Sequence, residues 1–106
     1  MEVLKCMPEK VGVEIAKYKL KSPDLEAEML EKAERLEIEF LLKQPGYLGA
    51  MILKDTDGVY TDIVFAKTAA DSKAICDAWM ENDFCKSYLE MIDESSVEMR
   101  FLERLM

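Results

Sequence analysis

Residues 47–65, which decide the fold, read YLGAMILKDTDGVYTDIVF. Two apolar runs flank the sequence Asp-Thr-Asp-Gly at 55–58, which is a turn signal because its glycine can take a positive φ. The run after the turn is rich in β-branched and aromatic residues, which is typical of a strand. The stretch therefore predicts a β-hairpin with strands 47–54 and 59–65.

The segment before the hairpin predicts a strand and then a helix. Residues 11–20 are rich in β-branched and aromatic residues and predict the first strand. Ser22 can cap a helix, and Pro23 fits its first position, where the missing N–H costs nothing. From 24 to about 43 the apolar residues recur at helical spacing. They are Leu25, Met29, Ala33, Leu36 and Phe40, with Leu30 and Leu41 widening the stripe.

The segment after the hairpin predicts two helices and a strand. Thr68 caps the second helix, with Asp71 three residues on as in a capping box. The pattern breaks near 81–83 and resumes as a shorter helix. The expected buried residues of the two helices are Ala74, Ile75, Ala78 and Trp79, then Phe84, Cys85, Tyr88, Leu89 and Ile92. The last strand is predicted from about Ser96 to Arg104.

The order strand, helix, strand, strand, helix, strand predicts an α+β fold of the ferredoxin-like βαββαβ type. Right-handed crossovers place the helices on one face of a four-stranded antiparallel sheet. We expect a single domain over residues 11–106, preceded by an N-terminal extension over 1–10. The other face of the sheet must meet water, a ligand or a partner.

Composition excludes several classes of function. Twenty-two acidic against fourteen basic residues give a net charge of −8, which disfavours nucleic acid as a partner. No apolar run approaches the ~20 residues of a membrane helix, and the first ten residues lack a signal-peptide core, so we expect a cytoplasmic protein away from membranes. Cys6, Cys76 and Cys85 have no C-x-x-C spacing and are expected to be reduced packing residues. The alternative for Cys85, a reactive thiol, lacks a histidine as base.

Alternation along the strands separates two sets of side chains. Val11, Val13 and Ile15, with Val59, Ile63 and Phe65, are expected to meet the helices. The mixed sets, expected on the uncovered face, are Glu14, Ala16, Tyr18 and Leu20 from the first strand, and Tyr60, Asp62 and Val64 from the third. Their large apolar members predict a half-buried face, and a homodimer closed through these faces accounts for it.

Glu14 and Asp62 are the candidate catalytic residues. They sit mid-strand in the mixed sets, and Arg100 of the last strand could neutralise them. One interpretation is a structural salt-bridge cluster, and the other is an acid or base with a raised pKa. Trp79 is likewise either a core residue or a wall that stacks on a substrate.

A functional cavity is expected between the sheet and the second helix, of at least roughly 300 Å³ if it holds a ligand. The expected walls are Tyr18, Tyr60, Trp79 and Tyr88, and the expected polar contacts are Glu14, Asp62 and Arg100. Without histidine, and with scattered cysteines, we expect neither metal nor haem.

The chain resembles the dimeric α/β-barrel superfamily, and within it the antibiotic biosynthesis monooxygenase-like domains. The likeness lies in the strand 13–20, the helix end FLLKQPGY at 40–47, the hairpin 57–64 and the segment 85–99. The resemblance implies a homodimer with sheets packed face to face and a cavity in each copy. Its members include cofactor-free monooxygenases of polyketide aromatics, haem-degrading enzymes, haem peroxidases and isomerases, and several of these activities depend on a histidine that is missing here.

Three functions stay open. The first is a dimeric barrel that binds a small hydrophobic or aromatic molecule. The second is a cofactor-independent monooxygenase-like enzyme with Glu14 or Asp62 as its base, and the third is a dimerisation or regulatory module. A continuous cavity favours the first two, whereas a solidly packed sheet interface favours the third.

Overall fold

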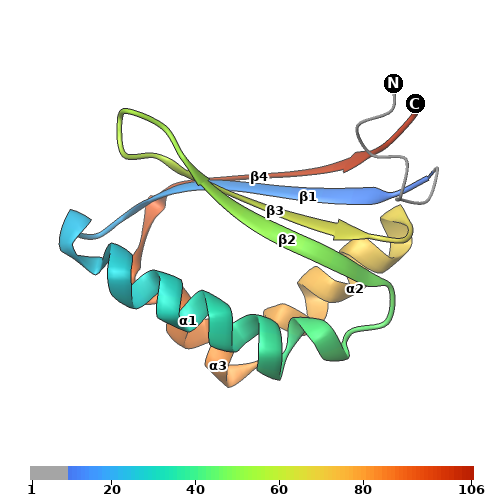
Figure 1. Ribbon diagram of the computed structural model, residues 1–106, viewed down its shortest axis with the longest axis horizontal. Helices are drawn as coiled ribbons and strands as arrows, with labels where there is room; N and C mark the ends of the chain where they lie inside the picture. The colour runs from blue at the N-terminus through green and yellow to red at the C-terminus, as the bar shows by residue number, and fades with distance from the viewer. Residues whose placement is uncertain (1–9) are drawn as a thin grey trace.

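The computed structural model describes residues 10–106, so Cys6 and nearly all of the expected N-terminal extension lie outside the described part. A four-stranded antiparallel sheet forms one layer and three helices form the other (Figure 1). The strands are β1 (Gly12–Leu20), β2 (Tyr47–Lys54), β3 (Tyr60–Ala66) and β4 (Ile92–Glu103), in the order β2-β3-β1-β4. The helices are α1 (Glu26–Glu39), α2 (Ala69–Trp79) and α3 (Asp83–Leu89), with short 3-10 turns at Pro23–Leu25 and Leu41–Lys43. The predicted ferredoxin-like βαββαβ fold is confirmed.

Local signals in the sequence place the element ends. Thr68 Oγ1 accepts the N–H of Asp71 at 3.0 Å and caps α2, as predicted. Ser22 Oγ accepts the N–H of Asp24 at 3.3 Å, before Pro23 opens the turn that leads into α1. In the hairpin, Gly58 has a φ of 80°, as the turn signal requires.

Strand β4 begins earlier than predicted. Ile92, assigned from the sequence to the buried face of the third helix, is instead the first residue of β4 and pairs with Leu20. The pairing of β1 with β4 shifts register between Lys17 and Lys19, and Ser96 Oγ accepts the N–H of Lys19 at 2.8 Å. This irregularity lets the strand continue through a polar stretch that gives no strand signal.

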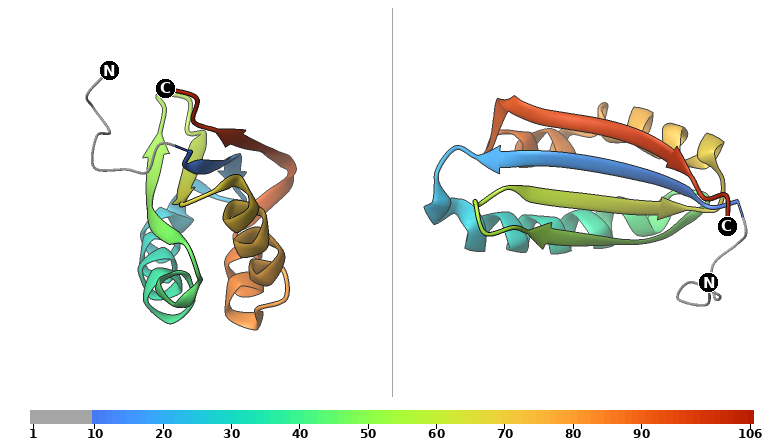
Figure 2. Two further views of the ribbon diagram at one scale, coloured as in Figure 1. Left: turned by 90° about the vertical axis from the view of Figure 1, so that its right-hand side faces the viewer. Right: turned by 90° about the horizontal axis from the view of Figure 1, so that it is seen from above.

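The core lies between the sheet and the helices. Its buried residues include Met29, Leu36 and Phe40 of α1, Ile75 of α2, Cys85 and Tyr88 of α3, and Tyr18, Tyr60 and Ile92 of the sheet. Figure 2 shows α1 on one side of the helix layer, with α2 and α3 on the other. One continuous core therefore joins both sides of the helix layer to the sheet.

The two sets of side chains on the sheet face the opposite way from the prediction. The mixed sets face the helices, because Tyr18 packs in the core with Met29 and Tyr88. The pairs Glu14↔Val64, Ala16↔Asp62 and Tyr18↔Tyr60 put Asp62, Val64 and Tyr60 on the same side. The prediction that the mixed sets lie on the uncovered face is therefore wrong, for the candidate residues Glu14, Tyr60 and Asp62 as well as for Tyr18, Leu20 and Val64. It assumed that the more apolar set must be the core set, whereas the tyrosines fill the core and bond its carboxylates.

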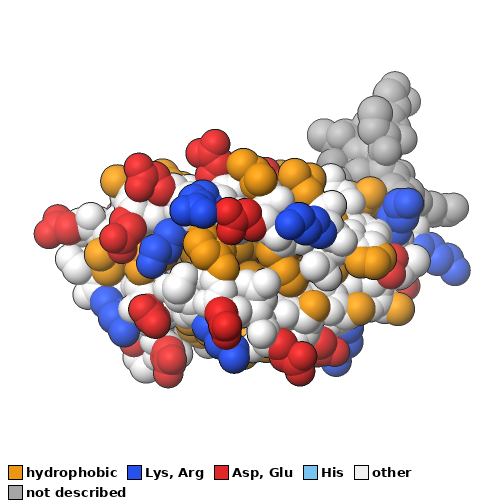
Figure 3. All heavy atoms as spheres, turned by 90° about the horizontal axis from the view of Figure 1, so that it is seen from below, with side chains coloured by type: hydrophobic (Ala, Val, Ile, Leu, Met, Phe, Trp, Pro, Cys, Tyr) orange, Lys and Arg blue, Asp and Glu red, His pale blue; other side chains and the backbone are white. Residues whose placement is uncertain are grey.

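The uncovered side of the sheet, called here the open side, is consequently more apolar than expected. Register and alternation place on it Val13 and Ile15 of β1, Ile63 and Phe65 of β3, Met51 and Leu53 of β2, and Leu102 of β4. The outer surface of the helix layer instead carries scattered charges of both signs, with apolar side chains visible between them (Figure 3). Among the described residues, no helix is long and apolar enough to cross a membrane.

Close packing at Gly12 gives a first prediction. A Cβ built on this residue would lie 2.4 Å from the carbonyl oxygen of Thr68, which belongs to the backbone and cannot easily yield. We expect Gly12→Ala to lower the free energy of unfolding by about 2–3 kcal/mol, the usual cost of overpacking. Urea denaturation would measure this. The matched variant Gly58→Ala has open space around its Cβ, so its cost should be only about 1 kcal/mol, from its positive φ. Equal losses in the two variants would contradict the packing argument.

Candidate functional site

Asp62 lies at the centre of a polar cluster between the sheet and the helices. Tyr18 donates its hydroxyl to Asp62 Oδ1 at 2.7 Å, and Tyr88 donates to Asp62 Oδ2 at 3.3 Å. The two tyrosine hydroxyls are also 2.8 Å apart. We call Tyr18, Asp62 and Tyr88 the tyrosine–aspartate cluster. It joins β1, β3 and α3 through one carboxylate.

Burial dominates the electrostatics of this cluster. It raises the pKa of Asp62 from its ordinary 3.8 to about 6, although the two tyrosine hydrogen bonds lower this pKa. The nearby charge of Glu14 raises the Asp62 pKa further. Burial and the Asp62 charge in turn raise the pKa of both tyrosines, so these stay protonated as donors. Asp62 therefore changes charge close to neutral pH.

Glu14 is the second carboxyl on this side of the sheet. It pairs with Val64, two residues from Asp62, so the two carboxyls are diagonal neighbours on adjacent strands, where Cα atoms lie about 7–8 Å apart. Burial raises the pKa of Glu14, and a hydrogen bond from the Cys76 thiol lowers it. Burial and Glu14 together raise the pKa of Cys76 to about 12, so the thiol remains protonated. We call Glu14 and Asp62 the carboxyl pair.

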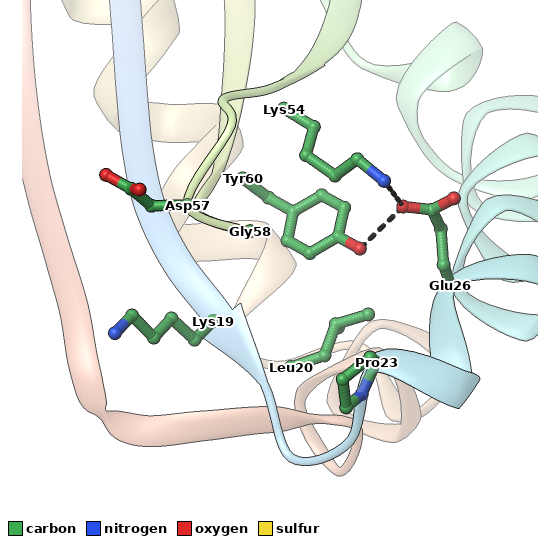
Figure 4. A pocket seen from close by; sticks show the side chains of 8 residues that line it. All are labelled: Lys19, Leu20, Pro23, Glu26, Lys54, Asp57, Gly58 and Tyr60. Carbon is green, nitrogen blue, oxygen red and sulfur yellow. Dashed lines mark hydrogen bonds and ion pairs between the residues drawn. The ribbon is translucent and has the colours of Figure 1, made fainter.

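Tyr60 closes one end of the cluster. Its ring stacks on that of Tyr18 with centroids 5.7 Å apart, and its hydroxyl donates to Glu26 Oε1 at 2.6 Å. Lys54 Nζ bonds the same oxygen at 2.6 Å. The bonds from Lys54 and Tyr60 lower the pKa of Glu26. A pocket of about 300 Å³ lies against this group, with Leu20 and Pro23 as apolar wall residues (Figure 4).

The predicted wall residues are found together but are mostly buried. Tyr18, Tyr60 and Tyr88 are each at most 5% exposed and pack on one another instead of lining an open cavity. Trp79 meets Tyr88 edge-on, with ring centroids 6.3 Å apart, at the margin of the core. The structure thus brings these aromatic side chains together and leaves the pocket beside Tyr60, on the side away from α2.

Arg100 is not part of the site. It pairs with Ile15 on β1, so its side chain lies on the open side, and it cannot neutralise the carboxyl pair. The prediction put Arg100 and the carboxyl pair on the same, uncovered face. It is wrong because the carboxyl pair lies on the helix-covered face, opposite Arg100. The partners that were missed are Cys76, Glu26 and Lys54. Nothing in the sequence marks the last two, since their contact joins segments 28 residues apart.

The described residues hold no group of three histidine, cysteine, aspartate or glutamate side chains arranged to bind a metal ion. The side chains gathered at the site carry carboxyl, hydroxyl and thiol groups, with the Lys54 ammonium at its edge. Among them, Asp62 is the one with a pKa of about 6, and general acid–base chemistry is most efficient near such a value.

Comparison with known proteins supports the fold. Neither the protein-family models nor the curated proteins give a match. Solved structures do match, including a protein from Bordetella bronchiseptica assigned as an antibiotic biosynthesis monooxygenase. That structure has a TM-score of 0.74 and 16% identity, over 92% of this chain and 99% of that one.

Two further structures show the range of proteins with this fold. SnoaB, a cofactor-independent oxygenase from Streptomyces nogalater, has a TM-score of 0.59 at 11% identity, over 89% of this chain and 90% of that one. A protein of unknown function from Nitrosomonas europaea has a TM-score of 0.63 at 14% identity, over 92% of each chain. At these identities the likeness concerns the fold. The chain has the fold of these solved structures, which include SnoaB and the Bordetella bronchiseptica protein assigned as an antibiotic biosynthesis monooxygenase.

Proposed function

We propose that this protein binds a small hydrophobic or aromatic molecule between its sheet and its helices, and that Asp62 exchanges a proton with a hydroxyl group of that molecule. The observation that carries the proposal is the tyrosine–aspartate cluster: a half-buried carboxyl, held by two tyrosine hydroxyls, with a pKa of about 6. Perturbed carboxyls of this kind are found preferentially at functional sites.

The surroundings of Asp62 support access for a ligand. Glu14, Asp62, Cys76 and Trp79 are all partly exposed, unlike the tyrosines beside them. On the helix-facing side of β4, Met99 pairs with Ala16 and remains 46% exposed. An apolar, accessible surface thus adjoins the carboxyl pair, which suits a ligand that is apolar except for one polar group.

The test uses 1-naphthol as the probe and Trp79, the only tryptophan, as the reporter. We expect 1-naphthol to change the tryptophan fluorescence saturably at pH 7.5. In Asp62→Asn its affinity should fall at least tenfold, because the amide cannot accept the proton. Asp77→Asn on the exposed side of α2 is the matched control and should bind like the wild type. Unchanged affinity in Asp62→Asn would refute the role of Asp62.

A second candidate function is cofactor-independent oxygenation of a phenolic substrate. The observation that favours it is that the Asp62 carboxyl, with a pKa of about 6, is mostly ionised above neutral pH and can accept a phenolic proton. The fold likeness to SnoaB is consistent with this chemistry. Oxygen uptake with a dihydroxynaphthalene should then exceed the uncatalysed rate and disappear in Asp62→Asn. Binding of 1-naphthol without oxygen uptake would leave binding alone as the function.

We also propose that the protein is a homodimer closed through the open sides of two sheets. The open side exposes Met51 at 45%, Leu53 at 48% and Leu102 at 45%, and these surround the apolar centre formed by Ile15 and Ile63. Apolar patches of this kind are typical of obligate interfaces. If no ligand binds and the dimer still forms, the remaining function is a dimerisation or regulatory module.

A further inference from the structure

A groove between the start of α2 and the end of β4 lies apart from the tyrosine–aspartate cluster. It has a volume of about 290 Å³. Its wall residues are Ala69, Ala70, Ser72 and Lys73 of α2, with Phe101, Leu102 and Glu103 of β4. Four of these seven residues are apolar, and the others supply one hydroxyl, one positive charge and one negative charge. The groove thus combines apolar walls with a small number of polar groups, as ligand sites do.

The first sign that this groove binds a ligand is the unpaired hydroxyl of Ser72. Its side chain is buried, at 3% exposure, and its Oγ has no hydrogen-bond partner among residues 10–106. Buried hydroxyl groups are nearly always hydrogen-bonded, so this buried hydroxyl in a residue of the groove wall is an unused donor. The backbone N–H of Ser72 is already used, since it donates to the carbonyl oxygen of Thr68 at 3.0 Å.

The second sign is a set of backbone donors and a cation at the same place, next to the carboxylate of Asp71 in the first turn of α2. The groove lies against the first turn of α2, where backbone N–H groups and the helix dipole favour an anion. Thr68 Oγ1 caps the N–H of Asp71, which leaves those of Ala69 and Ala70 for other acceptors. Lys73 Nζ lies 5.5 Å from the centroid of the Phe101 ring. The cation is thus held over an aromatic wall of the groove.

We propose that this groove binds a small apolar carboxylate. The hydroxyl of Ser72, the Lys73 ammonium and the free N–H groups of Ala69 and Ala70 all belong to the start of α2, so a carboxylate would be accepted at that end of the groove. The apolar walls require an aromatic or aliphatic remainder, and the volume limits it to a few carbon atoms around one ring. Glu103 on the facing strand opposes a second negative charge, so a singly charged carboxylate fits better than a phosphate dianion.

The test compares three probes of one shape: benzoate, neutral benzamide and cationic benzylamine. Titration followed by amide chemical shifts should show benzoate moving the signals of residues 69–73, with benzamide at least tenfold weaker and benzylamine without effect there. Equal binding of the three probes would refute a carboxylate site. No shift with benzoate at 10 mM would refute it as well.

Removing the positive or the negative charge of the groove should change benzoate affinity in opposite directions. Lys73→Gln should weaken benzoate about tenfold, and Glu103→Gln should tighten it several-fold, whereas Lys86→Gln on α3 should leave it unchanged. Asp62→Asn should also leave benzoate binding unchanged, so this result stands apart from the proposed function of Asp62. Weaker binding in Glu103→Gln would contradict the proposal.

Ser72→Ala separates a ligand donor from a structural residue. Removing an unpaired buried hydroxyl should raise the unfolding temperature slightly or leave it unchanged. Benzoate affinity should nevertheless fall several-fold, because the ligand loses a hydrogen bond. Unchanged benzoate affinity in Ser72→Ala would show that the hydroxyl takes no part in binding and would overturn its assignment.

Discussion

Ile63→Glu is expected to convert the proposed homodimer to a monomer at micromolar concentration. Ile63 lies at the centre of the open side, between Met51 of β2 and Ile15 of β1. In a two-fold symmetric interface every substitution occurs twice, so two glutamates would be buried near each other without partners. The dissociation constant should rise at least a thousandfold, which corresponds to about 4 kcal/mol.

Sedimentation velocity would measure this change, with far-UV circular dichroism to show that the monomer is folded. The matched control is Leu42→Glu, which also adds a charge at an apolar residue but lies in the 3-10 turn after α1 and is already 63% exposed. That variant should remain a dimer. A wild-type protein that sediments as a monomer would rule out the dimer. A dimeric Ile63→Glu protein would rule out the open sides as its interface.

Asp62→Asn is expected to remove much of the pH dependence of stability between pH 4 and 7. The folded protein holds the Asp62 proton more tightly than the unfolded chain does, because burial raises its pKa from 3.8 to about 6. Between these values the folded state binds more protons, so the wild type loses stability as pH rises, by up to about 3 kcal/mol above pH 6. Asparagine carries no charge at any of these pH values, so the loss from Asp62 should be absent.

The measurement is urea denaturation of both proteins at several pH values. The free energy of unfolding of the wild type is subtracted from that of the variant at each pH, so that the contributions of groups common to both cancel. For each protein, the free energy of unfolding at pH 4 serves as the reference. As pH rises from there, this free energy should fall less in Asp62→Asn than in the wild type. Burial also raises the pKa of Glu14, and this leaves a smaller slope of the same sign in the variant. Parallel stability curves for the two proteins would mean that Asp62 titrates normally and that the cluster does not perturb it.

Short-range signals predicted the architecture well. The hairpin turn at 55–58 and the caps at Ser22 and Thr68 depend only on residues a few positions apart. Such signals give element order, and the crossover rule then gives the sheet topology. The start of β4 was missed because its pairing depends on a contact between Lys19 and Ser96, 77 residues apart.

The direction of each sheet face could not be predicted from hydrophobicity. The set containing Ile15 and Ile63 is more apolar than the set containing Tyr18 and Asp62, yet the second set is the core. Hydroxyl and carboxyl groups satisfy each other there, and such pairing is visible only after folding. The carboxyl pair was found from the sequence because mid-strand acids are unusual. The expected contact of this pair with Arg100 is absent because the two carboxyls face the helices, whereas Arg100 lies on the open side.

Glu26 Oε1 is a single atom that accepts a hydrogen bond from Lys54 and another from Tyr60, at 2.6 Å each. Lys54 ends β2 and Tyr60 begins β3, so this atom fastens both arms of the hairpin to the first turn of α1. Both hydrogen bonds depend on the position of one carboxylate, so a motion that carries the carboxylate away releases both arms together. The same motion would also free the ring that covers Tyr18. The tip of the hairpin and the tyrosine stack are therefore expected to move as one mechanical unit.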